Sequence, residues 1–131
     1  VYIEKNSPRD ALECADIAIL ASGTATIEAS IFNVPSVIIY KSSWLSWIIA
    51  KNFVKIPYIG MSNLIANKKV MPEFVQNNAT PNKISNELIK IFNNKDYYNS
   101  IVNDLKLISE KLGSSGASLR AAKLILNDKN E

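Results

Sequence analysis

Apolar residues form two short uninterrupted runs early in the chain, with a more polar stretch between them. The first run is Ile17–Ala21 and the second is Val37–Tyr40. Runs of this length without polar alternation are typical of parallel strands covered on both faces. The residues between them, from Ala25 to about Phe32, favour a helix. The pattern therefore predicts a strand–helix–strand unit with parallel strands.

Shorter signals extend this unit toward the start of the sequence. Val1–Ile3 is typical of the end of a strand. Ser7 is a suitable N-cap, and Pro8 and Asp10 suit the first turn of a helix that runs to about Ala15.

The middle of the chain is less regular. Ser42 or Ser43 begins a predicted third helix that carries Trp44 and Trp47 and ends before Pro57. The tryptophans suit a core or an interface, with a sugar-stacking surface as the alternative. The stretch 58–76 is predicted to be irregular, with one short strand and a loop.

After Pro81 the pattern is helical only. One apolar stripe repeats at helical spacing before Gly113, and its members are Tyr97, Tyr98, Ile101, Val102, Leu105, Ile108 and Leu112. A last helix follows at Leu119–Leu126. We therefore expect an α/β part over 1–80 and a helical tail over 81–131 that packs on the same or a partner domain. Because the stripe must be buried somewhere, we also predict a homodimer through these C-terminal helices.

The composition limits the kinds of catalytic, metal and binding sites that the chain can contain. The 131 residues are 47% hydrophobic and 21% charged, which suits a single folded core. The absence of histidine excludes a Ser-His-Asp triad and a His-ligated metal site within this sequence. Cys14, the single cysteine, suggests a reduced, cytoplasmic protein and is expected to be a buried spectator. The net charge of +3 is scattered along the chain, so we expect no nucleic-acid partner.

Neither a membrane span nor a leader is visible in the sequence. No apolar run approaches the roughly 18 residues of a spanning helix, and no charged-then-apolar segment opens the chain. The sequence begins without Met in an apolar stretch, which suggests a piece of a longer protein.

The segment 21–29 carries the clearest chemical signal, because it lies where a buried strand passes into a helix. Ligands of open α/β sheets bind at this edge, and the free N–H groups of a helix start attract phosphate. Gly23 permits the close approach of a ligand, and Ser22 and Thr24 offer hydroxyl donors. Ala25 adds a free backbone N–H at the start of the helix. Glu28 can accept from two ribose hydroxyls, so the segment suits a nucleotide diphosphate. The alternative is an ordinary N-cap and turn.

A second polar group lies in the irregular stretch. Its members are Asn63, Asn67, Lys68, Lys69, Glu73 and Gln76. These side chains are donors and acceptors of the kind that a sugar or phosphate needs. A solvent-exposed loop is the alternative interpretation.

The chain resembles the carboxyl-terminal half of the bacterial lipid-A-disaccharide synthase family. The resemblance rests on three segments, in order and with matching spacing: ILASGTATIEASIFNVPSVIIYK, AKNFVKIPYIGMSNLIANKKVMPEFVQ and LGSSGASLRAAKLIL. It implies a partial Rossmann-like, donor-binding domain of a GT-B glycosyltransferase with a helical C-terminal tail. It also implies a UDP/substrate site made of Ser22, Gly23, Thr24, Ala25, Glu28, Asn63, Glu73 and Gln76.

The family's reaction joins UDP-2,3-diacylglucosamine to 2,3-diacylglucosamine 1-phosphate with inversion and releases UDP. The resemblance implies no cofactor and no metal, with the N–H groups at 23–25 and Lys41 or Lys68 stabilising the departing diphosphate. The base is expected from an amino-terminal domain outside this sequence, so the chain alone is expected to be inactive.

The implied partners are the UDP-sugar donor, a lipid acceptor and the membrane surface, at the cytoplasmic side of a Gram-negative-type inner membrane. A non-catalytic nucleotide-sugar-binding fragment remains one alternative. Another UDP-sugar enzyme of the same fold, such as an epimerase or a peptidoglycan glycosyltransferase, remains the other.

Overall fold

The computed structural model describes residues 7–43, 57–113 and 116–128. Within them, the strands β1 (Ala18–Ala21), β2 (Ser36–Tyr40) and β3 (Glu73–Val75) form a parallel sheet in the order β1-β2-β3. Since all three strands run the same way, their carboxyl ends lie at one edge of the sheet. The predicted parallel α/β architecture is confirmed.

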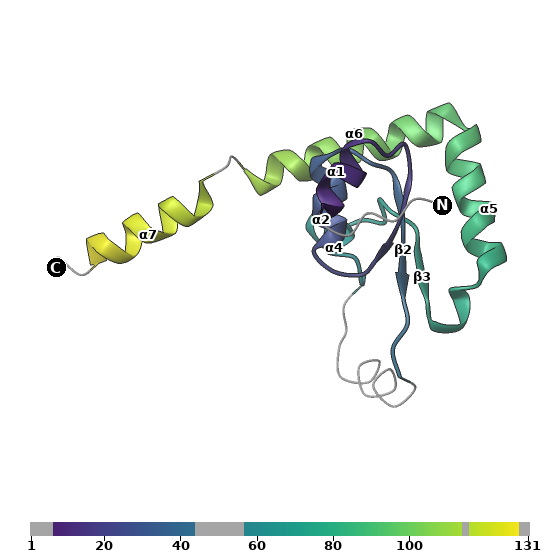
Figure 1. The fold of residues 1–131 in the computed structure, drawn as a ribbon, viewed down its shortest axis with the longest axis horizontal. Helices are drawn as coiled ribbons and strands as arrows, with labels where there is room; N and C mark the ends of the chain where they lie inside the picture. Colours follow the sequence, from purple (N-terminus) through teal and green to yellow (C-terminus); the bar gives the residue numbers. More distant parts are fainter. Residues whose placement is uncertain (1–6, 44–56, 114–115, 129–131) are drawn as a thin grey trace.

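Helices cover both faces of this sheet (Figure 1). On one side lie α1 (Pro8–Glu13), α2 (Ala25–Ile31) and α4 (Met61–Ala66), and on the other lies α5 (Pro81–Asn93). The uninterrupted apolar run of β2 follows from this arrangement, because Val37 and Ile38 are both almost fully buried, one on each face.

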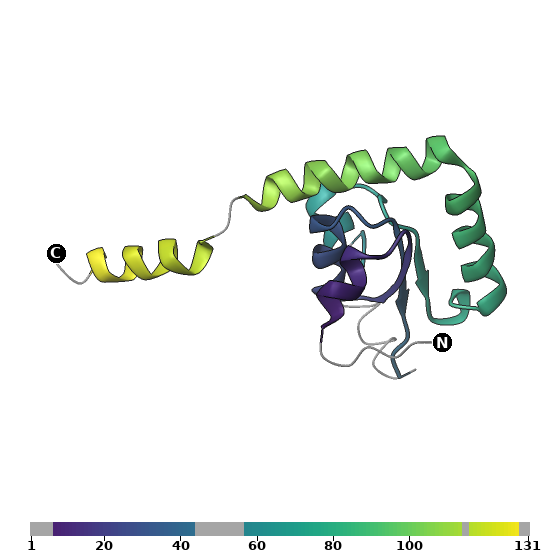
Figure 2. The same cartoon turned by 45° about the horizontal axis from the view of Figure 1, so that its top comes forward.

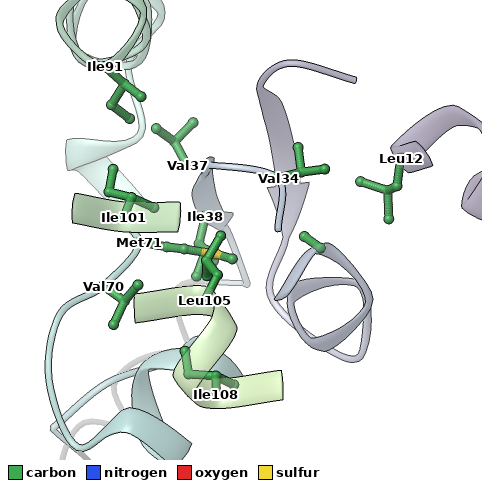
Figure 3. Packing of buried hydrophobic residues seen from close by; sticks show 11 residues of the cluster. Leu12, Val34, Val37, Ile38, Val70, Met71, Ile91, Ile101, Leu105 and Ile108 are labelled. Carbon is green, nitrogen blue, oxygen red and sulfur yellow. The ribbon is translucent and has the colours of Figure 1, made fainter. Parts of the chain in front are cut away.

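The long helix α6 (Lys95–Leu112) crosses α2 and α4 at one end of the sheet (Figure 2). Its residues Ile101, Leu105 and Ile108 are at most 2% exposed and join the same core cluster as Val37 and Ile38 (Figure 3). The central part of the apolar stripe is therefore covered by helices of its own chain. Of the two expected partners for this stripe, the same domain and a partner domain, the same domain covers these residues, and the homodimer stays a prediction.

The last helix, α7 (Ala117–Asp128), extends away from the rest of the molecule in both views (Figures 1 and 2). Its large apolar side chains Leu119, Leu124 and Leu126 are all more than 60% exposed.

Most helix and strand ends predicted from local sequence signals lie within a residue or two of the ends in the structure. The Oγ of Ser7 accepts from the N–H of Asp10 at the start of α1, as its position predicts. That helix ends at Glu13, before the expected Ala15, and the next residue, Cys14, is exposed rather than buried. The expectation of a buried cysteine is wrong, because it lies at the helix end facing solvent.

The stretch 58–76 is more regular than its sequence indicates. It contains the predicted short strand, β3, and also the helix α4, which the sequence analysis did not predict. Asn67, with φ 54°, ends that helix, and a short 3-10 turn, η1 (Gln76–Asn78), follows β3. The predicted strand at Val1–Ile3 and the predicted tryptophan helix lie outside the described residues.

Tyr97, near the start of α6, contacts α5 where the two long helices meet. Its hydroxyl donates to the carboxylate of Glu87 at 2.9 Å, and the Nζ of Lys90 lies 4.8 Å from the centre of its ring. Burial, with a further contribution from Glu87, raises the pKa of Tyr97 to about 12.

Among the described helices, none is both long enough and apolar enough to cross a membrane.

Candidate functional site

The turn Ser22–Thr24 connects the carboxyl end of β1 to α2. The N–H of Ser22 donates to the carbonyl of Ile39 at 3.0 Å, which continues the sheet pairing by one residue. Gly23 has φ 142°, and a Cβ at this position would meet no atom within 4 Å. Glycine is therefore favoured here by the backbone conformation and not by crowding.

The start of α2 is not capped by any described residue. No hydrogen bond of the described residues uses the N–H of Gly23, Thr24 or Ala25, and the side chain of Thr24 makes no capping bond. These donors lie at the positive end of the helix dipole. Unbonded N–H groups in this position can bind an anion.

The hydroxyls around this turn have different surroundings. The Oγ of Ser22 donates to the carbonyl of Ile59 at 3.0 Å, and the Oγ1 of Thr26 donates to the carbonyl of Gly23 at 2.8 Å. Thr24 is exposed, and no described residue binds its hydroxyl. Ser22 and Thr26 therefore shape the turn, whereas Thr24 can reach a ligand.

Glu28 lies one turn into α2 and is partly buried. No hydrogen bond or ion pair of the described residues involves its carboxylate. A carboxylate in this position can accept from two neighbouring hydroxyls of one ligand.

Glu73, by contrast, is engaged within the chain. Its carboxylate accepts from the N–H of Ile59 at 3.0 Å, the N–H of Gly60 at 2.8 Å and the Nδ2 of Asn63 at 2.7 Å. Gly60 is the N-cap residue of α4, so this carboxylate holds the two residues that lead into the helix.

Asn63 is fully buried, and its amide group is fully bonded. The Oδ1 accepts from the N–H groups of Val70 and Met71 at 2.9 Å each. The Nδ2 donates to the carbonyl of Met71 at 2.8 Å and to Glu73. Asn63 therefore holds α4 against the segment that leads into β3.

Gln76 lies directly after β3, with φ 49°. Its Nε2 donates to the Oγ of Ser42 at 2.8 Å, and its Oε1 accepts from the N–H of Ser42 at 3.3 Å. Gln76 thus joins the segment after β2 to the end of β3, at the edge of the sheet where the Gly23 turn lies.

Two lysines were candidates for holding the diphosphate. Lys41 follows β2 directly at the carboxyl edge. The Nζ of Lys68 lies 2.6 Å from the Oδ1 of Asp104 on α6, so an acidic partner already neutralises it. Over the described ranges, no group of three or more Cys, Asp or Glu residues is placed to hold a metal ion.

The chain is also similar in sequence to known proteins. The family model described as lipid-A-disaccharide synthetase matches residues 1–125. The chain is 36% identical over 126 residues, 96% of its length, to the lipid-A-disaccharide synthase of Syntrophus aciditrophicus (strain SB), and covers 33% of that protein. It is 38% identical over 119 residues, 88% of its length, to lipid-A-disaccharide synthase 1 of Legionella pneumophila (strain Lens), and covers 31% of that protein. The chain thus spans about a third of the length of the curated relatives that it matches.

Proposed function

Because the chain belongs to the lipid-A-disaccharide synthetase family, we propose that its sheet edge is the donor-binding half of a glycosyltransferase that makes the lipid A disaccharide. The observation that carries this proposal is the uncapped start of α2. The N–H groups of Gly23, Thr24 and Ala25 bind the diphosphate of a UDP-sugar, with Ser22 shaping the turn beneath them.

Glu28 binds the ribose of the same nucleotide. Its carboxylate lies one turn from the diphosphate turn and has no partner among the described residues, which leaves both oxygens available. Gln76 lies nearest the sugar, at the end of β3. Asn63 and Glu73 belong to the site as supports, because their polar atoms are bonded inside the chain.

In the whole protein, the donor is UDP-2,3-diacylglucosamine and the acceptor is 2,3-diacylglucosamine 1-phosphate. The transfer inverts the anomeric centre, and the N–H groups at the start of α2 stabilise the charge on the departing UDP, assisted by Lys41. The base that removes the acceptor proton comes from the rest of the protein, so this chain alone is inactive.

UDP binding by the 131-residue chain tests the donor site. Calorimetry should detect UDP binding that is unchanged by EDTA, because backbone N–H groups replace a metal as the diphosphate ligand. A strict requirement for magnesium would exclude the proposed mode, and uridine binding as tightly as UDP would show that the α2 start does not hold the diphosphate.

Activity requires the remaining two-thirds of the family's length. In a chimera, residues 1–131 replace the matching third of the Syntrophus aciditrophicus relative, and UDP release is followed with the diacylglucosamine substrates. Turnover of the diacylglucosamine substrates by the chimera supports the assignment as this glycosyltransferase. UDP binding without turnover favours a nucleotide-sugar-binding fragment, and a preference for another UDP-sugar favours a different enzyme of the same fold.

The same proposal places the whole protein in the cytoplasm, at the surface of the inner membrane where its lipid acceptor lies. Pairing of two chains would use α7, whose apolar side chains are exposed, rather than the covered stripe of α6. Sedimentation at increasing micromolar concentration tests this pairing, and a monomer at every concentration excludes it.

A further inference from the structure

The carboxylate of Glu73 lies at the centre of the contacts that hold the segment before α4. It accepts from three donors, the N–H groups of Ile59 and Gly60 and the Nδ2 of Asn63, at 2.7 to 3.0 Å for the shortest contact of each. A carboxylate that accepts three hydrogen bonds fixes the position of each donor. The segment 59–60 therefore depends on a side chain from β3.

The same segment contacts the turn at the start of α2. The carbonyl of Ile59 accepts from the Oγ of Ser22 at 3.0 Å. The residue whose N–H binds Glu73 is thus the residue whose carbonyl binds the Ser22–Thr24 turn. Any shift of Ile59 changes the anchor of that turn.

A second contact joins α2 and α4 within the helices themselves. The Oγ of Ser62, in the first turn of α4, donates to the carbonyl of Thr26 at 2.6 Å and lies 2.8 Å from the Oγ of Ser30. All three residues are fully buried. Because both partners are buried, this contact cannot be replaced by water without cost.

Space around Gly60 is also restricted. A Cβ on Gly60 would overlap the side chain of Ile38 and lie 3.2 Å from the Oε1 of Glu73. The absence of a side chain at residue 60 lets the carboxylate reach the backbone. The segment 59–60 is therefore packed between β2 and Glu73, with little room for another position.

We infer that Glu73 is a positioning residue for the diphosphate turn, acting through Ile59 on Ser22 and not by contact with the ligand. This inference rests on the proposed function for the identity of the ligand, but the contacts between Glu73 and the turn exist without one. Replacement of the carboxylate should therefore change the turn even when no nucleotide is present.

The first test needs no ligand and uses NMR on the 131-residue chain. Glu73→Gln keeps the size of the side chain but places an NH₂ group toward backbone donors. It should shift the amide signals of Ser22, Gly23 and Thr24. Glu110→Gln, the same change at an exposed position on α6, is the matched control and should leave them unchanged. Unshifted turn amides in a folded Glu73→Gln variant would overturn the inference.

The reciprocal variant covers the case in which Glu73→Gln does not fold. Ser22→Ala removes only the hydroxyl at the edge of the turn. It should shift the amide signals of Ile59 and Gly60, because their coupling to Ser22 is mutual. If these signals stay in place, the inference is wrong.

The second test separates positioning from direct contact with UDP. Ser22→Ala and Glu73→Gln should each weaken UDP binding by roughly ten-fold, and the double variant should be little weaker than either one, since both break the same linkage. Independent, multiplying losses would show that Glu73 contacts the ligand and would overturn the inference. If wild-type chain binds no UDP, the proposed function fails, while the amide shifts still decide the positioning role.

Discussion

The helices α2 and α4 begin side by side, yet the N–H groups of the two residues that precede each helix have different surroundings. At α4, the backbone donors of Ile59 and Gly60 are bound by Glu73. At α2, the donors of Gly23, Thr24 and Ala25 have no partner among the described residues. The donors before α4 are therefore held by the chain itself, whereas those at the start of α2 are available to a ligand.

The largest expected effect is at the supporting end. Asn63→Ala removes an amide group that makes four hydrogen bonds, three of them buried, and leaves the N–H groups of Val70 and Met71 without a partner. We expect a loss of about 3 to 5 kcal/mol in the free energy of unfolding, measured by urea denaturation. Asn103→Ala, on the exposed face of α6, is the control and should change stability by less than about 0.5 kcal/mol. Equal effects of the two would remove the contrast between the helix starts.

The next effect is at the open end and concerns binding. Glu28→Gln keeps the shape of the side chain but removes its charge, so UDP affinity should fall by about 1.5 to 3 kcal/mol. Stability should change little, because the carboxylate makes no hydrogen bond or ion pair with the described residues. Calorimetry and urea denaturation on the same variant measure both. Normal UDP binding would show that Glu28 has a structural or catalytic role instead.

A smaller effect is expected at the turn itself. Gly23→Ala places a side chain at φ 142° where no atom would obstruct it, so the whole cost is conformational. We expect about 1 to 2 kcal/mol of lost stability in thermal unfolding. Thr24→Ala, next to it with an ordinary helical φ of −61°, is the matched control and should be nearly neutral. A neutral Gly23→Ala would mean that the turn adopts another conformation in solution.

The two starts also differ in how well their sequence predicts them. The unit β1–α2–β2 was predicted nearly to the residue, because its signals are local: two continuous apolar runs, with Ser22-Gly23-Thr24 between the first run and the helix. Helix α4 is not predicted because no capping residue marks its start, and the side chain that holds Gly60, Glu73, lies 13 residues further along the chain. A local sequence pattern does not show such a distant contact.

The candidate site divides in the same way. The open donors at 23–25 follow from the position of the turn after a strand, which the sequence reveals. The surroundings of Asn63 and Glu73 do not, since polar residues in an irregular stretch suggest exposure, whereas here Asn63 is fully buried. Only the packing of α4 against α2 and α6, with Asn63 bonded to Glu73 of β3, shows that these side chains are supports.

The contact of Glu73 with the residues before α4 also has a consequence for how this part of the molecule opens. A helix of six residues is too short to persist alone, and Glu73 can hold Ile59 and Gly60 only while β3 is paired with β2. We expect α4 and β3 to open together as one cooperative unit, so that the amides of Ile59, Gly60 and Ile38 exchange with deuterium at a common rate. The amide of Ile38 belongs to the set because it donates to the carbonyl of Pro72, just before β3. In such an opening Ile59 would release Ser22 as well, and the Ser22–Thr24 turn would lose its anchor whenever this unit unfolds.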